Sequence, residues 1–134
     1  MTKTENYNLP QWEKNDRVLM EDFNAAMNQI EKGLSAKCEM YYGTYTGTGT
    51  YGQANPTVLH MGFTPKLVIV MGSATASGEH IVLLNPYDVG KSYGGDSGAV
   101  YLTWLEDGVQ WYSPFRESTQ FNRLNETYHY LAFQ

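Results

Sequence analysis

Apolar residues follow a helical spacing early in the chain and a strand-like spacing in the rest. Between residues 16 and 34 they recur every three or four positions, which predicts one amphipathic helix. Its apolar stripe consists of Leu19, Phe23, Ala26 and Ile30, with Met20, Met27 and Leu34 beside it at intervals of seven. A helix of this length is about 28 Å long and only marginally stable alone in water, so we expect it to bundle with copies of itself. The alternative is that it packs on the β-structure of its own chain.

The residues before this helix are mostly polar. We expect residues 1–9 to be extended, and Pro10 is suited to open one short helical turn. Trp12 then presents a large apolar side chain, which either packs on a neighbouring helix or fixes the chain to a protein upstream. Asn15 or Asp16 is the expected N-cap of the main helix.

From residue 40 onward apolar and polar residues alternate, which is typical of strands. The expected strands cover 40–52, 57–63, 66–72, 80–84, 99–106, 109–113, 118–124 and 127–133. The last four form two hairpins, which turn at Asp107-Gly108 and Asn125-Glu126. No helix interrupts these strands, so they predict an antiparallel β-sandwich.

Two loops separate the expected strands, a short one at 73–79 and a long, turn-rich one at 85–98. The most apolar run, 67–71, is expected at the centre of the sandwich. The chain therefore divides into an N-terminal segment with a stalk helix, 1–36, and a β-sandwich head domain, 37–134.

The charge balance argues against several classes of partner. With 9 Lys and Arg against 14 Asp and Glu, the net charge is −5. Such a chain is poorly suited to nucleic acid or to anionic membranes, and we expect neither nucleic acid binding nor membrane insertion. The N-terminus lacks the apolar segment of a secretory signal, so we expect synthesis and folding in a cytoplasm. Cys38 is the only cysteine, which rules out a disulfide within the chain.

Catalytic chemistry has one superficial candidate, the string Gly-Asp-Ser-Gly at 95–98, which surrounds the nucleophile of trypsin-like proteases. A triad also needs an oriented base and an oxyanion pocket, so we interpret the string as a turn and expect no enzyme. His60, His80 and His129 each stand alone in alternating strands and are read as core or interface residues. We expect no metal site and no cofactor, since two carboxylates in the 85–98 loop are too few for calcium.

Binding chemistry is more plausible, because tyrosine rings stack on sugars while carboxylates and amides take the hydroxyls. The candidate glycan contacts are Tyr87, Asp88, Tyr93 and Asp96 in the long loop, together with Tyr112. The structural alternatives are a loop-anchoring role for Tyr87 and a place in the core or in cross-strand pairs for Trp104 and Trp111.

Several segments, taken in order, resemble a known family. Residues 6–34, NYNLPQWEKNDRVLMEDFNAAMNQIEKGL, resemble the N-terminal segment of tail-fibre and other appendage proteins of phages and prophages of Gram-positive bacteria. The β-half resembles the head that often follows, with GTYTGTGT, then NPTVLHMGFTPKLVIVMG, and a closing strand that ends in Leu131-Ala132-Phe133. A weaker similarity links the head to H-type lectin sandwiches.

This resemblance implies a homotrimer with a short coiled-coil stalk and three displayed β-heads. The implied seam consists of Leu19, Phe23, Ala26, Met27, Ile30 and Leu34. The glycine-rich strand 40–52 is then expected near the trimer axis, where small residues allow close approach. Residues 1–15, with Leu9 and Trp12, are the implied attachment to a tail, baseplate or capsid protein of the virion.

The implied function is that of a tail fibre or receptor-binding tip that contacts a host-surface glycan. The alternative is a purely structural appendage, such as a head fibre or baseplate decoration, without a ligand. Either protein is made in the cytoplasm of the bacterial host and ends on the virion.

Overall fold

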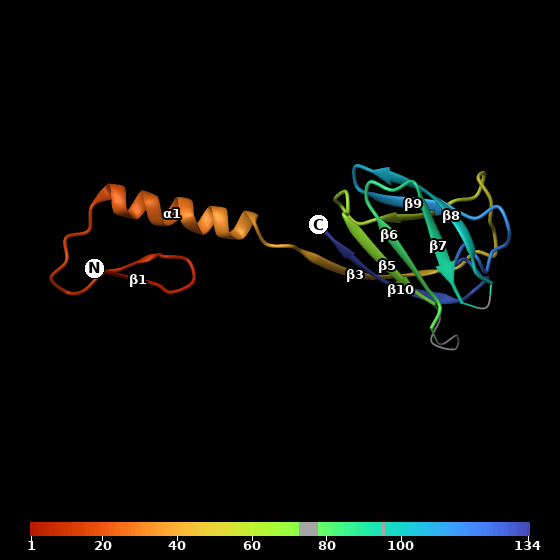
Figure 1. The fold of residues 1–134 in the computed structure, drawn as a ribbon, viewed down its shortest axis with the longest axis horizontal. Coiled ribbons are helices and arrows are strands. Elements are labelled where there is room, and N and C mark those ends of the chain that lie inside the picture. The colour runs from red at the N-terminus through yellow and green to blue at the C-terminus, as the bar shows by residue number, and fades with distance from the viewer. Residues whose placement is uncertain (73–77, 95) are drawn as a thin grey trace. The chain divides into compact units, whose positions relative to one another are not determined.

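The computed structural model describes residues 1–72, 78–94 and 96–134, and Figure 1 shows its fold. The chain divides into two compact units, Met1–Cys38 (unit 1) and Glu39–Gln134 (unit 2). Unit 1 contains a helix and unit 2 a large sheet. Most of the expected loop 73–79, and Gly95 of the Gly-Asp-Ser-Gly string, lie outside the described residues.

Unit 1 consists of a small hairpin followed by one helix. Strand β1 (Thr2–Lys3) pairs antiparallel with β2 (Pro10–Gln11), and helix α1 covers Met20–Ser35. Pro10 therefore lies in a strand and not at the start of a helical turn, which corrects the sequence prediction. A two-stranded ribbon tolerates proline because its outer edges need no backbone donor.

Helix α1 begins at Met20, later than the apolar pattern predicts. Leu19 occupies the N-cap position with extended backbone, and no side chain caps the helix. Asp16, one of the two expected caps, accepts a 2.8 Å hydrogen bond from the Glu13 N–H and lies 2.8 Å from the α-ammonium of Met1. These contacts, the bond from Glu13 foremost, lower the pKa of the Asp16 carboxyl. Asp16 thus closes a turn ahead of the helix and is not its cap.

Unit 2 is built on one antiparallel sheet of eight strands. The strands are β3 (Met40–Thr46), β4 (Thr57–His60), β5 (Leu67–Met71), β6 (His80–Leu84), β7 (Val89–Tyr93), β8 (Gly98–Leu105), β9 (Gly108–Tyr112) and β10 (Thr127–Phe133). Their order across the sheet is β3-β10-β5-β6-β7-β8-β9-β4, and the sheet curls around the core (Figure 1). The mainly β, antiparallel fold is confirmed, but one curled sheet stands in place of the two packed sheets of a sandwich.

The core lies on the inner face of this sheet. Strand β5 runs between β10 and β6, and its Val68 and Val70 are fully buried. The largest buried side chains are Trp111, Tyr128 and Phe121, so Trp111 is a core residue as the structural alternative predicts. Inner positions alternate with outward ones along each strand, and this alternation leaves half of every apolar run on the outside.

Three segments differ from the sequence prediction. The glycine-rich strand ends at Thr46, and the loop after it is held by Asn122, whose amide accepts from the Thr48 N–H (2.9 Å) and donates to the Thr50 carbonyl (2.8 Å). The expected loop 85–98 contains β7, which pairs with β6 and β8. Residues 118–124, expected as a strand, form turns that side-chain hydrogen bonds stabilise.

Gln120 is the centre of this irregular segment and is fully buried. Its Oε1 accepts from the backbone N–H of Gly52 (3.0 Å) and of Ser113 (2.9 Å), and its Nε2 donates to the Asn55 carbonyl (2.8 Å). The Gln120 side chain therefore provides hydrogen-bond partners for backbone groups in two loops.

Two glycines at the first strand serve contacts within the chain. A Cβ on Gly43 would collide with the phenol ring of Tyr130, and one on Gly47 with the backbone carbonyl of Arg123. The sequence prediction attributed these small residues to close approach of three chains near an axis. The structure instead gives both of them a neighbour in their own chain.

Candidate functional site

The apolar row of α1 is exposed. Phe23, Met27, Ile30 and Leu34 each leave between 38 and 61 % of their surface accessible, and Leu19 at the N-cap is exposed as well. Because these residues are three and four positions apart, they form one continuous stripe along the helix. We call these five residues the helix stripe. An apolar row of this kind on a short helix indicates a contact surface.

Ala26 does not belong to the helix stripe. It is the only buried residue of α1, and together with Asp22 it lines a small hollow opposite Met1, Asn8 and Pro10 of the same chain. The prediction that Ala26 faces another copy is therefore wrong for this structure. At 100° per residue Ala26 lies at the border of the stripe, and the N-terminal hairpin covers that border.

The two expected attachment residues have contacts in unit 1. Leu9 lines a shallow apolar hollow with Tyr7, Ile30 and Leu34 at the C-terminal half of α1. Trp12 is half-buried, and its indole Nε1 is enclosed without an acceptor among the described residues. Leu9 thus contributes to the packing of unit 1, and the attachment role stays a prediction.

The outer face of the sheet is mostly apolar where β3, β10, β5 and β6 lie side by side. The strand register places the outward side chains in rows across these four strands. The apolar members of these rows are Met40, Tyr42, Leu67, Ile69, Met71, Val82, Leu84, Leu131 and Phe133, and the polar members are Thr44, His80 and His129. We call the nine apolar members the outer apolar face. This surface was not predicted from the sequence, because it depends on which strands are neighbours in the sheet.

A shallow hollow of about 250 Å³ lies within the outer apolar face. Tyr42, Ile69, Met71 and Leu131 line it together with His129. The Tyr42 hydroxyl and His129 Nδ1 are 2.6 Å apart, so a hydrogen bond fixes one wall of the hollow. The surface is therefore uneven and suited to receive protruding apolar side chains.

The five expected glycan contacts do not come together. Tyr87 and Asp88 lie in the turn before β7, whereas Tyr93 ends β7 and Asp96 follows it. Tyr112 ends β9, two strands away from β7, where it lies opposite Tyr101, which in turn lies opposite Val89. The prediction of one loop site was wrong because β7 separates its two halves.

Two aromatic clusters remain on the outer surface near these residues. Tyr112 stacks on Tyr101, with ring centroids 5.2 Å apart, and Tyr93 stacks on His80 at 5.0 Å. The Nζ of Lys91 lies 5.2 Å from the centroid of the Tyr93 ring. Tyr101 was missed because only the register Tyr101–Tyr112 shows that the two rings share a face.

Tyr87 has a structural role through its backbone. Its carbonyl accepts a 2.8 Å hydrogen bond from the indole Nε1 of Trp104, while its own ring is exposed. Trp104 is half-buried at the border of the core. The loop-anchoring alternative for Tyr87 therefore has a contact to support it.

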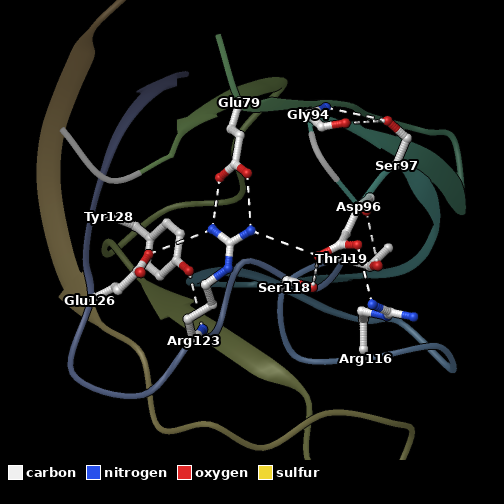
Figure 2. A network of polar contacts seen from close by, with 10 residues as sticks. All are labelled: Glu79, Gly94, Asp96, Ser97, Arg116, Ser118, Thr119, Arg123, Glu126 and Tyr128. Carbon is white, nitrogen blue, oxygen red and sulfur yellow. Dashed lines mark hydrogen bonds and ion pairs between the residues drawn. The ribbon is translucent and has the colours of Figure 1, made fainter. Parts of the chain in front are cut away.

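Asp96 is engaged in a polar network at the end of the sheet, which Figure 2 shows. Its carboxylate accepts from Ser118 Oγ (2.6 Å) and lies 3.2 Å from Arg116 Nη1, and its carbonyl accepts from Thr119 Oγ1 (3.0 Å). These contacts fasten the β7–β8 turn to the segment after β9. Asp96 is thus committed to the fold and is a poor candidate for a sugar ligand.

Arg123 holds the other half of this network (Figure 2). Its guanidinium binds Glu79 through two hydrogen bonds of 2.9 and 3.0 Å, and it lies 3.6 Å from Glu126 and 4.0 Å from Asp96. The bond to Glu79 raises the pKa of Arg123 further above its usual range. Three carboxylates around one guanidinium form a clamp between loops that are distant in sequence.

The residues weighed for catalysis have other partners. Ser97 Oγ donates to the Gly94 carbonyl (3.0 Å), and His80 Nδ1 lies 2.9 Å from a backbone carbonyl. His60 Nδ1 lies 2.8 Å from Asp107 Oδ2 and the His60 ring is exposed, so His60 neither stands alone nor belongs to the core. Across the described ranges, no three His, Cys, Asp or Glu side chains gather closely enough to hold a metal ion.

Within the part of the chain that the structure describes, no helix has the length and apolar character needed to cross a membrane. Comparisons of the chain with protein families, with curated proteins and with solved structures found no match.

Proposed function

We propose that this chain is a self-associating appendage subunit of the phage tail-fibre type, in which copies bundle through α1 and display unit 2. The observation that carries the proposal is the exposed helix stripe on a helix of 16 residues. A helix this short is marginally stable alone, and burial of its apolar row between copies supplies the missing stabilisation.

The distribution of polar residues supports a bundle of copies. Asn24, Asn28 and Glu31 are exposed beside the helix stripe, and residues 1–11 cover part of the opposite border. The open strip is therefore narrow, as in a coiled-coil seam. The number of three copies and the place on a virion rest on the sequence resemblance, as does attachment to a tail, baseplate or capsid protein through residues 1–15.

The role proposed for unit 2 is contact with a host-surface glycan. The stacked pair Tyr101 and Tyr112 supports this role, since an exposed aromatic platform suits a sugar ring. A glycan array and a host-cell pull-down with Tyr112→Ala test it, with Tyr87→Ala as the control. Loss of binding only in Tyr112→Ala supports glycan contact. If the unmodified chain binds none of many glycans and hosts, a purely structural appendage is favoured.

Sedimentation velocity on charged variants of α1 tests the bundle. We expect the double variant Phe23→Glu, Ile30→Glu to sediment as a monomer, because it places charge in the helix stripe. The matched control Asn24→Glu, Asn28→Glu adds the same charge on the polar side and retains the oligomer. An unmodified chain that is already monomeric would overturn the proposal and favour a helix that packs on its own β-structure.

A further inference from the structure

We propose that the outer apolar face of unit 2 is a second contact surface between sister chains, and that copies of this face meet one another in the bundled assembly. This inference rests on the proposed self-association through α1. It adds the surface that orders the β-units against one another.

The composition of the outer apolar face indicates that something covers it. Strand β5 is apolar at every position, a pattern typical of strands buried on both faces. One face of β5 points into the core, but Met71 on the other face is exposed, as are Tyr42 on β3 and Val82 on β6. A contiguous apolar surface of this kind on a soluble domain is characteristic of an interface.

The chemistry of the face suits a second copy of itself. The chain carries a net charge of −5, yet β3, β5, β6 and β10 contain no Asp, Glu, Lys or Arg at any position. The cores of protein interfaces are similarly depleted of charge and enriched in tyrosine and methionine. The face therefore suits a neutral, apolar partner. Each sister chain in the bundle carries the same face and so provides such a partner.

The length of the connection between the two units explains why the sister chain is the occupant. Helix α1 ends at Ser35 and β3 begins at Met40. Five residue steps span at most about 17 Å, so chains bundled through α1 bring their β3 strands close together. Strand β3 contributes Met40 and Tyr42 to the outer apolar face, so part of this face begins only a few residues after α1 in each bundled copy.

The edge of the sheet leads to the same conclusion. β3 is an edge strand that pairs with β10. The hydrogen bond from Gln134 N to the Glu39 carbonyl shows that the backbone N–H and C=O groups of the odd-numbered residues in this segment point toward β10. The backbone groups of Tyr42 and Thr44 therefore point away from β10, and among the described residues no partner is found for them. β3 has no charge, proline or bulge to protect this edge, as isolated edges usually do.

Val82→Glu and Val58→Glu are the variants that test this surface. Both valines are exposed on the outward face of the sheet, at 45 and 37 %, but Val58 lies on β4 at the opposite edge. We measure the concentration at which each full-length oligomer dissociates, by sedimentation equilibrium. Val82→Glu is expected to raise it about tenfold or more, since a charge enters an apolar interface, while Val58→Glu leaves it close to that of the unmodified chain.

Oxidation by peroxide provides a second readout on the same samples. Met40 and Met71 are exposed in the single chain, so they should react slowly in the oligomer and quickly in the Phe23→Glu, Ile30→Glu variant. Equal oxidation rates in the oligomer and in the Phe23→Glu, Ile30→Glu variant would contradict the second contact surface. Equal dissociation concentrations of the two valine variants would contradict it as well. Neither result would contradict the helix bundle. A monomeric unmodified chain would instead remove the proposed function itself.

Discussion

Arg123 and Glu79 meet through two parallel hydrogen bonds, of 2.9 Å from Nη1 and 3.0 Å from Nη2. Glu79 is buried next to the start of β6, and Arg123 lies in the segment between β9 and β10. The pair therefore joins parts of the chain that are 44 residues apart in sequence. Bidentate pairs of this kind fix orientation as well as distance.

Removal of the guanidinium should destabilise unit 2. We expect Arg123→Met to lower the free energy of unfolding by about 3 kcal/mol, because it leaves the Glu79 carboxylate buried without its partner. The control Arg116→Met breaks the exposed pair with Asp96 and should cost less than about 1 kcal/mol. Urea titration measures both, and equal losses would contradict the clamp.

Gln120→Leu tests the buried amide at the centre of the loops. The change leaves the N–H groups of Gly52 and Ser113 without an acceptor, so we expect a loss of about 2–3 kcal/mol in unfolding free energy. Amide hydrogen exchange should also become faster at both positions. Gln110→Leu on β9, where no such bonds are present among the described residues, is the control and should leave both readouts nearly unchanged.

The glycine contacts lead to a comparison of two alanine variants. Gly47→Ala should destabilise strongly, because its new Cβ meets the backbone carbonyl of Arg123, which cannot turn aside. In Gly52→Ala the new Cβ has open space around it, so only the positive φ of 92° is unfavourable. We expect it to lower the free energy of unfolding by about 1 kcal/mol. Thermal unfolding should therefore separate the two, and a larger shift for Gly52→Ala would refute the packing role of Gly47.

Stability should fall at alkaline pH because of tyrosines in the core. Burial raises the pKa of Tyr45 well above its usual range, with a further contribution from Tyr128. Above pH 10 the unfolded chain releases this proton and the folded chain retains it, so stability present below pH 10 is lost as pH rises. The slope is about 1.4 kcal/mol per pH unit for each such tyrosine. Tyr45→Phe should reduce the slope in urea titrations between pH 10 and 11.5, and an unchanged slope would contradict this assignment.

Much of the β-structure could be predicted from the sequence because several strands are apolar and bounded by turn residues. β6 has the predicted ends, and β5 differs by one residue at each end. β7 was missed because its inward residue is Ser92, which is buried but polar, so the alternation is not visible as hydrophobicity. The Asn-Pro and Gly residues around it favoured a loop.

The surfaces of interest were predictable only in part. The helix stripe can be predicted from the spacing of apolar residues alone, since an α-helix turns once every 3.6 residues. The outer apolar face depends on which strands are neighbours, and nothing in the local pattern pairs Ile69 with both Leu131 and Val82. The same holds for the partners of Arg123, which lie on distant segments. Contacts between residues that are far apart in the sequence cannot be predicted from the local pattern of residues.

Light scattering coupled to size exclusion on the unmodified chain tests the central claim most directly. Self-association through the helix stripe predicts a mass that is a multiple of the 15.2 kDa of one chain, and the resemblance to tail-fibre proteins predicts three times that mass. A mass of 15.2 kDa that does not change with concentration would contradict it.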